Sequence, residues 1–179
     1  MIKKPDIRKN SMNYGAILGV TLIALTLLLY LVNRSFSKSF NWVEYLIIIS
    51  VITIGTKSLR DKEMGGAISF TQALGSGILI SFFGSIFVAF FTYVLYVIID
   101  PGLLEELFEF NEELMQEQGK FSEEKIEYRM NIMRETITPL RLSLFVIPVY
   151  TFVGFLLSLL VSIFLKKEKN PFSKTENQI

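Results

Sequence analysis

The sequence predicts an all-α integral membrane protein. Its four transmembrane helices are expected to form a bundle, with an extracytoplasmic αα-hairpin between the third and fourth spans. Hydrophobic residues make up 51% of the chain, and the charged residues gather in the connections between long apolar runs. Each run is close to or above the roughly 20 residues needed to cross the hydrocarbon core of a bilayer. The predicted spans cover about 14–32, 40–56, 70–99 and 140–165.

The spans and their connections are expected to form one membrane domain over residues 1–169, followed by a flexible cytoplasmic tail at 170–179. Basic residues precede the first apolar run, as they do in a signal peptide. That run has about 19 residues, however, whereas the apolar region of a signal peptide has roughly 7–15. Small residues typical of a cleavage site are missing after it. We therefore expect the first span to remain uncleaved.

The distribution of lysine and arginine predicts the orientation of the spans. With the N-terminus in the cytoplasm, eleven Lys and Arg residues fall on the cytoplasmic side and seven on the other side, as the positive-inside rule favours. The connection 100–138 carries eleven acidic residues against four basic ones, so its net charge is −7. We expect a multi-pass protein of the inner (plasma) membrane, with both termini cytoplasmic and the acidic connection outside.

The second span carries an ionisable residue, Glu44, near its start. Trp42 and Tyr45 lie beside it, and such aromatic residues are typical of the membrane–water interface. A glutamate at this position can extend its carboxylate towards water. We therefore expect Glu44 to reach the outer boundary of the membrane.

The connection 100–138 is predicted to fold as a hairpin of two helices. Asp100 and Pro101 have the residue types preferred at a helix N-cap and first turn. Gly119 is expected to end the first helix, because glycine commonly follows the last residue of a helix. Ser122 is then expected to start the second helix. Each half contains apolar residues at helical spacing. The predicted stripes are Leu103, Leu107, Phe110 and Leu114, then Ile126, Met130, Met133 and Ile137.

Small residues recur every four positions along the third span, and shorter sets occur on the first and fourth spans. Small residues at this spacing let two helix backbones approach closely within a membrane. Two interpretations remain open, namely packing within one four-helix monomer and a seam between two copies. The candidate helix-packing residues are Ala73, Gly77, Ser81, Ser85, Ala89, Gly15, Gly19, Gly154, Ser158 and Ser162. The phenylalanines of the third span are expected to face lipid or to fill gaps between helices.

The chain contains neither histidine nor cysteine, which excludes thiolate nucleophiles, Cys/His zinc sites and histidine proton shuttles. The remaining carboxylate, serine, lysine and tyrosine residues show no recognisable catalytic or metal-binding spacing. We therefore expect no enzymatic activity, and identify no catalytic, cofactor-binding or metal-binding residues. Ionisable residues in the middle of a span usually mark transport pathways. The three candidates, Glu44, Lys57 and Arg141, all lie near span ends, so none of them marks a pathway in the middle of a span.

Four short motifs carry a resemblance to a known family. They are Asn13-Tyr14-Gly15, Gly66-Ala67-Ile68-Ser69-Phe70-Thr71-Gln72-Ala73, Tyr93-x-x-Tyr96 with Asp100-Pro101, and Lys166-Lys167-Glu168-Lys169. From Asn13 to Lys169 the chain resembles a small family of bacterial membrane proteins, the domain of unknown function numbered 4199. The resemblance implies a four-span inner-membrane protein. It implies no functional residues, because the family has no assigned activity.

Together these observations favour a non-enzymatic integral membrane protein that acts as an accessory or interaction partner in the bacterial envelope. The alternative is a small oligomeric transporter or channel. The expected partners are the lipid bilayer and either a second copy of the chain or another envelope protein, with no nucleic acid and no cofactor.

Overall fold

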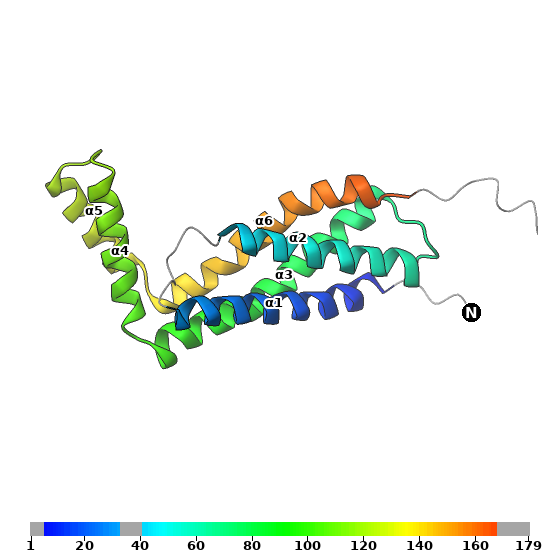
Figure 1. The fold of residues 1–179 in the computed structure, drawn as a ribbon, viewed down its shortest axis with the longest axis horizontal. Helices are drawn as coiled ribbons and strands as arrows, with labels where there is room; N and C mark the ends of the chain where they lie inside the picture. Colours follow the sequence, from blue (N-terminus) through cyan, green and yellow to red (C-terminus); the bar gives the residue numbers. More distant parts are fainter. Residues whose placement is uncertain (1–5, 33–40, 168–179) are drawn as a thin grey trace, which may run out of the picture.

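A computed structural model describes residues 6–32 and 41–167, which form helices and one isolated β-bridge. Four helices lie side by side in an elongated bundle (Figure 1), namely α1 (Ile7–Leu31), α2 (Asn41–Ser58), α3 (Phe70–Val94) and α6 (Pro139–Leu165). Two shorter helices, α4 (Leu103–Glu117) and α5 (Glu123–Thr136), project from one end of this bundle. Single π-helical turns, Leu59–Glu63 and Leu95–Ile99, follow α2 and α3.

The predicted fold class, an all-α protein with four transmembrane helices, is confirmed. Four helical stretches in the described residues are long and apolar enough to cross a membrane: Ile7–Leu31, Trp42–Glu63, Phe70–Ile99 and Pro139–Leu165. Large apolar side chains lie exposed along their outer surfaces, such as Phe152 and Phe164 of α6. In a water-soluble protein such surfaces would be costly, whereas in a bilayer they contact lipid tails.

The third and fourth spans each begin directly after a capping residue. Ser69 accepts a hydrogen bond from the backbone N–H of Gln72 (3.3 Å), and the Gln72 side chain accepts one from the Ser69 N–H (3.0 Å). This reciprocal pair forms a capping box. Thr138 caps α6 by accepting from the backbone N–H of Arg141 (3.3 Å), and Pro139 takes the first helical position.

The first two spans are longer than the sequence predicts. α1 begins at Ile7, about two turns before residue 14, because Asp6 accepts from the Lys9 N–H and caps the helix. Asn10 and Ser11 in this added part are buried against other helices, and Asn10 donates to the Gly55 carbonyl (3.0 Å). α2 continues past residue 56 and ends in the π-helical turn, while Phe40 and the tail 170–179 lie outside the described residues.

The helix α3 occupies the centre of the bundle and makes its most extensive contacts with α6 and α1. Buried aliphatic residues from all four long helices form one continuous core. These are Leu18, Leu22, Ile48, Ile52, Ile80, Val88 and Val161. The core therefore fixes how α2 and α6 are placed relative to one another, which determines the cavity described below.

The two ends of the bundle differ in charge. At one end, Ile68 and Lys167 exchange two backbone hydrogen bonds of 2.9 Å, and Arg60 donates to the Leu165 carbonyl (3.4 Å). The described chain starts and finishes at this end, which carries the basic residues Arg8, Lys9, Lys57, Arg60, Lys62, Lys166 and Lys167. At the other end, Tyr30 of α1 donates to Asp100 (3.0 Å), beside the acidic helices α4 and α5.

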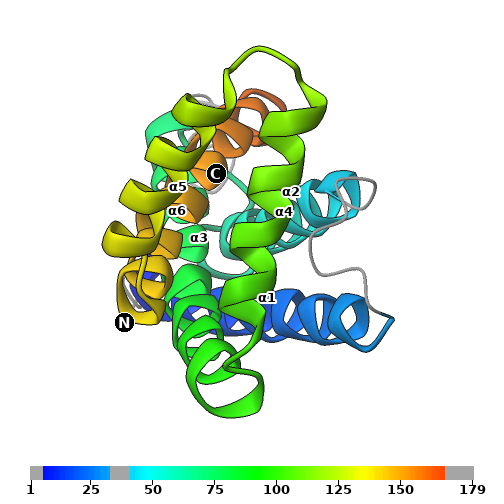
Figure 2. The same cartoon turned by 90° about the vertical axis from the view of Figure 1, so that its left-hand side faces the viewer.

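The helices α4 and α5 pack on each other through a small core of their own. Figure 2 shows them side by side at the end of the bundle. Phe108, Ile126 and Met130 are buried, and Arg134 forms an ion pair with Glu105 (2.7 Å). Two details differ from the predicted hairpin. α4 begins at Leu103, since the Asp100 carboxylate accepts from the Gly102 N–H (3.0 Å) before the helix starts. The face that contacts α5 is centred on Phe108, while Leu107, Phe110 and Leu114 are half-buried.

Candidate functional site

The small residues of α3 lie against those of α6. A Cβ atom added to Gly77 would overlap the hydroxyl of Ser158, and one added to Gly154 would overlap Ser81. Ser81 and Ser158 are almost completely buried, and each donates to the carbonyl four residues earlier in its own helix. The two helices thus approach closely within one chain, at the positions where both carry small side chains.

A second close approach joins α1 to another face of α3. A Cβ atom added to Gly15 would overlap Phe83, and one added to Gly19 would overlap Phe87. The sequence analysis expected the α3 phenylalanines to face lipid or to fill gaps, and Phe87 is indeed 43% exposed. In addition, the Cβ atoms of Phe83 and Phe87 lie over the α1 glycines. The sequence analysis did not identify Gly84 as a packing residue, although it is buried opposite Leu18.

The remaining candidate packing residues occupy separate places in the core. Ala73 belongs to a cluster with Leu59, Met64 and Ile68 near the basic end. Ser85 donates to the Phe82 carbonyl (2.7 Å) and is buried, as are Ala89 and Ser162. The stripe therefore runs the length of α3. Its members Gly77 and Ser81 lie directly against small residues of α6, namely Ser158 and Gly154.

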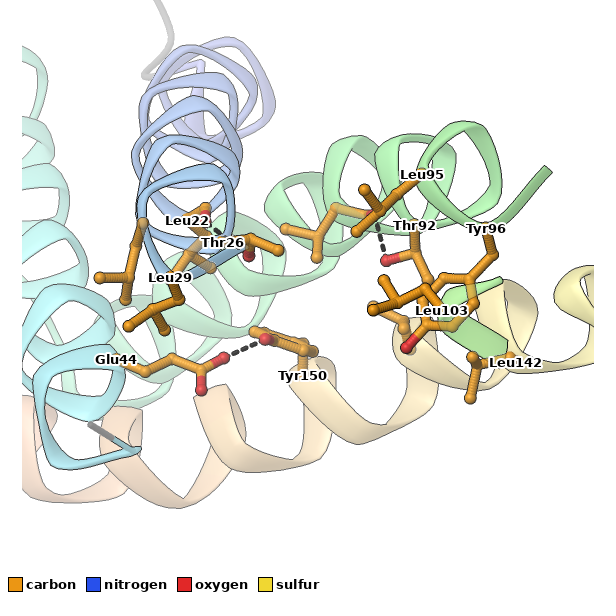
Figure 3. Close-up of a pocket in the computed structure, with 13 residues that line it drawn as sticks. Leu22, Thr26, Leu29, Glu44, Thr92, Leu95, Tyr96, Leu103, Leu142 and Tyr150 are labelled. Atoms are coloured by element: carbon orange, nitrogen blue, oxygen red, sulfur yellow. Dashed lines mark hydrogen bonds between the residues drawn. The ribbon is translucent and has the colours of Figure 1, made fainter. Parts of the chain in front are cut away.

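A partly open cavity of about 290 Å³ lies between the helices near the acidic end of the bundle (Figure 3). Its walls come from α1, α2, α3, the π-helical turn after α3, the start of α4, and α6. Most of the lining is aliphatic. The polar side chains that line it are Thr26, Glu44, Thr92, Tyr96 and Tyr150.

The carboxylate of Glu44 is the charged group of this cavity. Tyr150 of α6 donates a hydrogen bond to Glu44, and Figure 3 shows the two polar groups pointing towards one another. In Figure 1 the start of α2 is set back from the ends of α1 and α6. Glu44, in the first turn of α2, therefore lies among the other helices. Its carboxylate is partly exposed and bonds to a side chain of another helix. The expectation that Glu44 reaches the outer boundary of the membrane stays a prediction.

The hydroxyl protons of the two threonines in the cavity are already donated to backbone carbonyls. Thr26 donates to the Leu22 carbonyl (3.0 Å), and Thr92 donates to the Val88 carbonyl (2.9 Å). Their oxygens can therefore still accept hydrogen bonds but cannot donate one without breaking an existing bond. The cavity combines apolar walls, one carboxylate and hydroxyl acceptors, which is chemistry suited to a positively charged guest.

Comparison with known families decides what the chain is related to. The family described as Protein of unknown function (DUF4199) matches residues 13–167. The chain belongs to this family. The matched stretch covers most of α1, all of α2, α3 and α6, and the α4–α5 pair, so the resemblance seen in the sequence motifs is confirmed. No curated protein and no solved structure matches the chain.

The pairing of Glu44 with Tyr150 was missed in the sequence, although two signals point to it. The second span has a short apolar run for a membrane helix and carries a carboxylate in its first turn. Tyr150 is the single tyrosine of an otherwise strongly apolar α6. In apolar surroundings a tyrosine hydroxyl needs a hydrogen-bond partner, and a carboxylate needs a donor. Matching these two requirements across helices would have suggested the contact.

Proposed function

We propose that this member of the DUF4199 family is a non-enzymatic membrane protein that serves as an accessory or interaction partner in the bacterial envelope. The α4–α5 pair is the observation that carries this proposal. It is a packed unit with its own core, it projects from the bundle, and its outer surface displays many exposed glutamates. The exposed glutamates are Glu105, Glu106, Glu109, Glu113, Glu117, Glu123, Glu124, Glu127 and Glu135.

The charge of the α4–α5 pair favours a basic partner. Fields of one sign steer oppositely charged surfaces together and raise association rates. The exposed apolar side chains Tyr128 (67%) and Ile132 (46%) of α5 add area that a partner could cover. The absence of histidine and cysteine from the sequence supports a role in binding rather than catalysis.

The proposed orientation places the α4–α5 pair outside the inner (plasma) membrane and both termini in the cytoplasm. Its support is the separation of charge, because basic residues gather at the end of the bundle where the described chain starts and finishes. Such residues are retained on the cytoplasmic side of bacterial membranes. The α4–α5 pair then meets the aqueous space outside.

Site-specific photocrosslinking in native membranes tests the partner role. A photoreactive amino acid at Glu113 of α4 should give one reproducible crosslinked product, and the same group at Phe164 on the lipid-facing surface of α6 should not. Changing Glu109 and Glu117 to lysine should remove the Glu113 product if charge recruits the partner. Crosslinking to many proteins in proportion to their abundance would contradict the proposal.

A small oligomeric transporter or channel is the second candidate, and the cavity is the observation that favours it. Ionisable groups inside a membrane bundle commonly mark translocation pathways, and Glu44 lines this cavity. Flux measurements in liposomes test this alternative. Ion or solute flux that requires Glu44 would favour transport, whereas flux equal to that of empty liposomes would exclude it.

A further inference from the structure

The described residues provide the Glu44 carboxylate in the cavity with a hydrogen-bond donor but with no positively charged partner. Glu44 is half-buried among apolar side chains, where a nearby cation stabilises a carboxylate more strongly than it does in water. The ion pairs of the described residues join Arg60 with Asp61 and Arg134 with Glu105. No lysine or arginine in the described part of the chain forms an ion pair with Glu44, so Tyr150 supplies its side-chain donor.

The shape and lining of the cavity restrict the guest that could supply the missing charge. A hard divalent ion prefers six or more oxygen ligands, and this cavity is walled mainly by Leu and Val side chains around one carboxylate. Its volume of about 290 Å³ is at the lower end of the range for small-molecule sites. The aromatic rings of Tyr96 and Tyr150 add surfaces of the kind that attract organic cations.

We propose that the cavity binds a small lipophilic monocation, an amine or quaternary ammonium ion with an apolar body. The positive centre lies against the Glu44 carboxylate, which is held in place by the hydrogen bond from Tyr150. The apolar body packs on the aliphatic walls from α1, α3 and α6, which include Leu25, Val88 and Val146. The hydroxyl oxygens of Thr26 and Thr92 accept any N–H groups of an amine. This proposal is independent of the partner role of α4 and α5, because it concerns groups inside the bundle.

Calorimetric titration of the full chain in phosphatidylcholine nanodiscs tests the proposal, with benzyltrimethylammonium as the probe and empty nanodiscs as the reference. The neutral, water-soluble compound N,N-dimethylbenzamide has a similar size and serves as the comparison ligand. We expect the cation to bind at least about tenfold more tightly than the amide, because only the cation gains from the carboxylate. This comparison requires no mutation, so it does not depend on whether a variant folds.

A pair of matched variants locates the site. Glu44→Gln keeps an oxygen that can accept from Tyr150 but removes the charge, and should weaken cation binding by about tenfold or more. Glu63→Gln makes the same change in the π-helical turn that ends the same span, at the opposite end of the bundle, and should leave affinity unchanged. Equal affinity for the cation and the amide, no measurable cation binding at millimolar concentration, or equal binding by wild type and Glu44→Gln would each overturn the proposal.

Discussion

Glu44 and Tyr150, 106 positions apart in the sequence, meet through a hydrogen bond inside the bundle. Whether a residue near the start of a span reaches water depends on how deeply that helix sits beside its neighbours. The sequence identifies the residue but not this depth, since the depth follows from core contacts such as those of Ile48 and Ile52. The same reason explains why Gly84 and the Cβ atom of Phe83 were missed as contacts of α1.

The contact of Gly154 with Ser81 gives the first residue-scale prediction. Gly154→Ala should lower the free energy of unfolding in detergent by roughly 1–3 kcal/mol, because the new Cβ overlaps both the Cβ and the hydroxyl of Ser81. Gly75→Ala on α3 is the control, since nothing lies within 4 Å of its added Cβ. Chemical denaturation monitored by circular dichroism measures both. A Gly154→Ala variant as stable as Gly75→Ala would mean that α3 and α6 lie farther apart.

The burial of Ser81 compared with Phe90 gives the second prediction. Ser81 is 1% exposed and Phe90 is 71% exposed, although both belong to α3. Ser81→Leu should destabilise the protein strongly, since a full core has no room for added side-chain volume. Phe90→Leu should change the unfolding temperature little, because it replaces one lipid-facing apolar side chain with another. Similar melting temperatures for the two variants would argue against a seam along this face.

At the scale of elements, the starts of the third and fourth spans were predictable from local capping residues. Ser69 with Gln72 and Thr138 with Pro139 define the starts of α3 and α6, and the structure begins both helices there. The start of α1 was missed because Asn10 and Ser11 are polar, and their burial depends on contacts with α2 and α3. The packing face of α4 was shifted by one position, since Leu107 and Phe108 fit the apolar pattern equally well.

The small core of the α4–α5 pair gives an element-scale prediction. Met130→Asp should raise hydrogen exchange throughout α4 and α5, because a buried charge without a partner destabilises the contact with Phe108 and Ile126. Exchange in α3 should stay slow. Ile132→Asp is the matched control on the same helix, at a position 46% exposed. Fast exchange across α4 and α5 already in the wild type would show that the pair does not hold together in solution.

At the scale of the whole molecule, the bundle separates charge along its length. Basic residues gather at the end formed by the start of α1, the α2–α3 connection and the end of α6, while α4 and α5 give the other end its acidic character. The positive-inside rule, applied to this arrangement, gives the orientation that we propose. Because the chain crosses the bundle four times, the α2–α3 connection and the α4–α5 pair lie at opposite ends. A measurement of which side of the membrane each of them faces therefore tests the four-span topology.

Cysteine labelling from outside the cell tests this topology most directly. The natural chain has no cysteine, so single substitutions report without background. In intact spheroplasts, Gln118→Cys at the end of α4 should react with a membrane-impermeant maleimide, whereas Lys62→Cys in the α2–α3 connection should react only after lysis. Labelling of both positions before lysis, or of Lys62→Cys alone, would contradict a four-span bundle with its acidic helices outside.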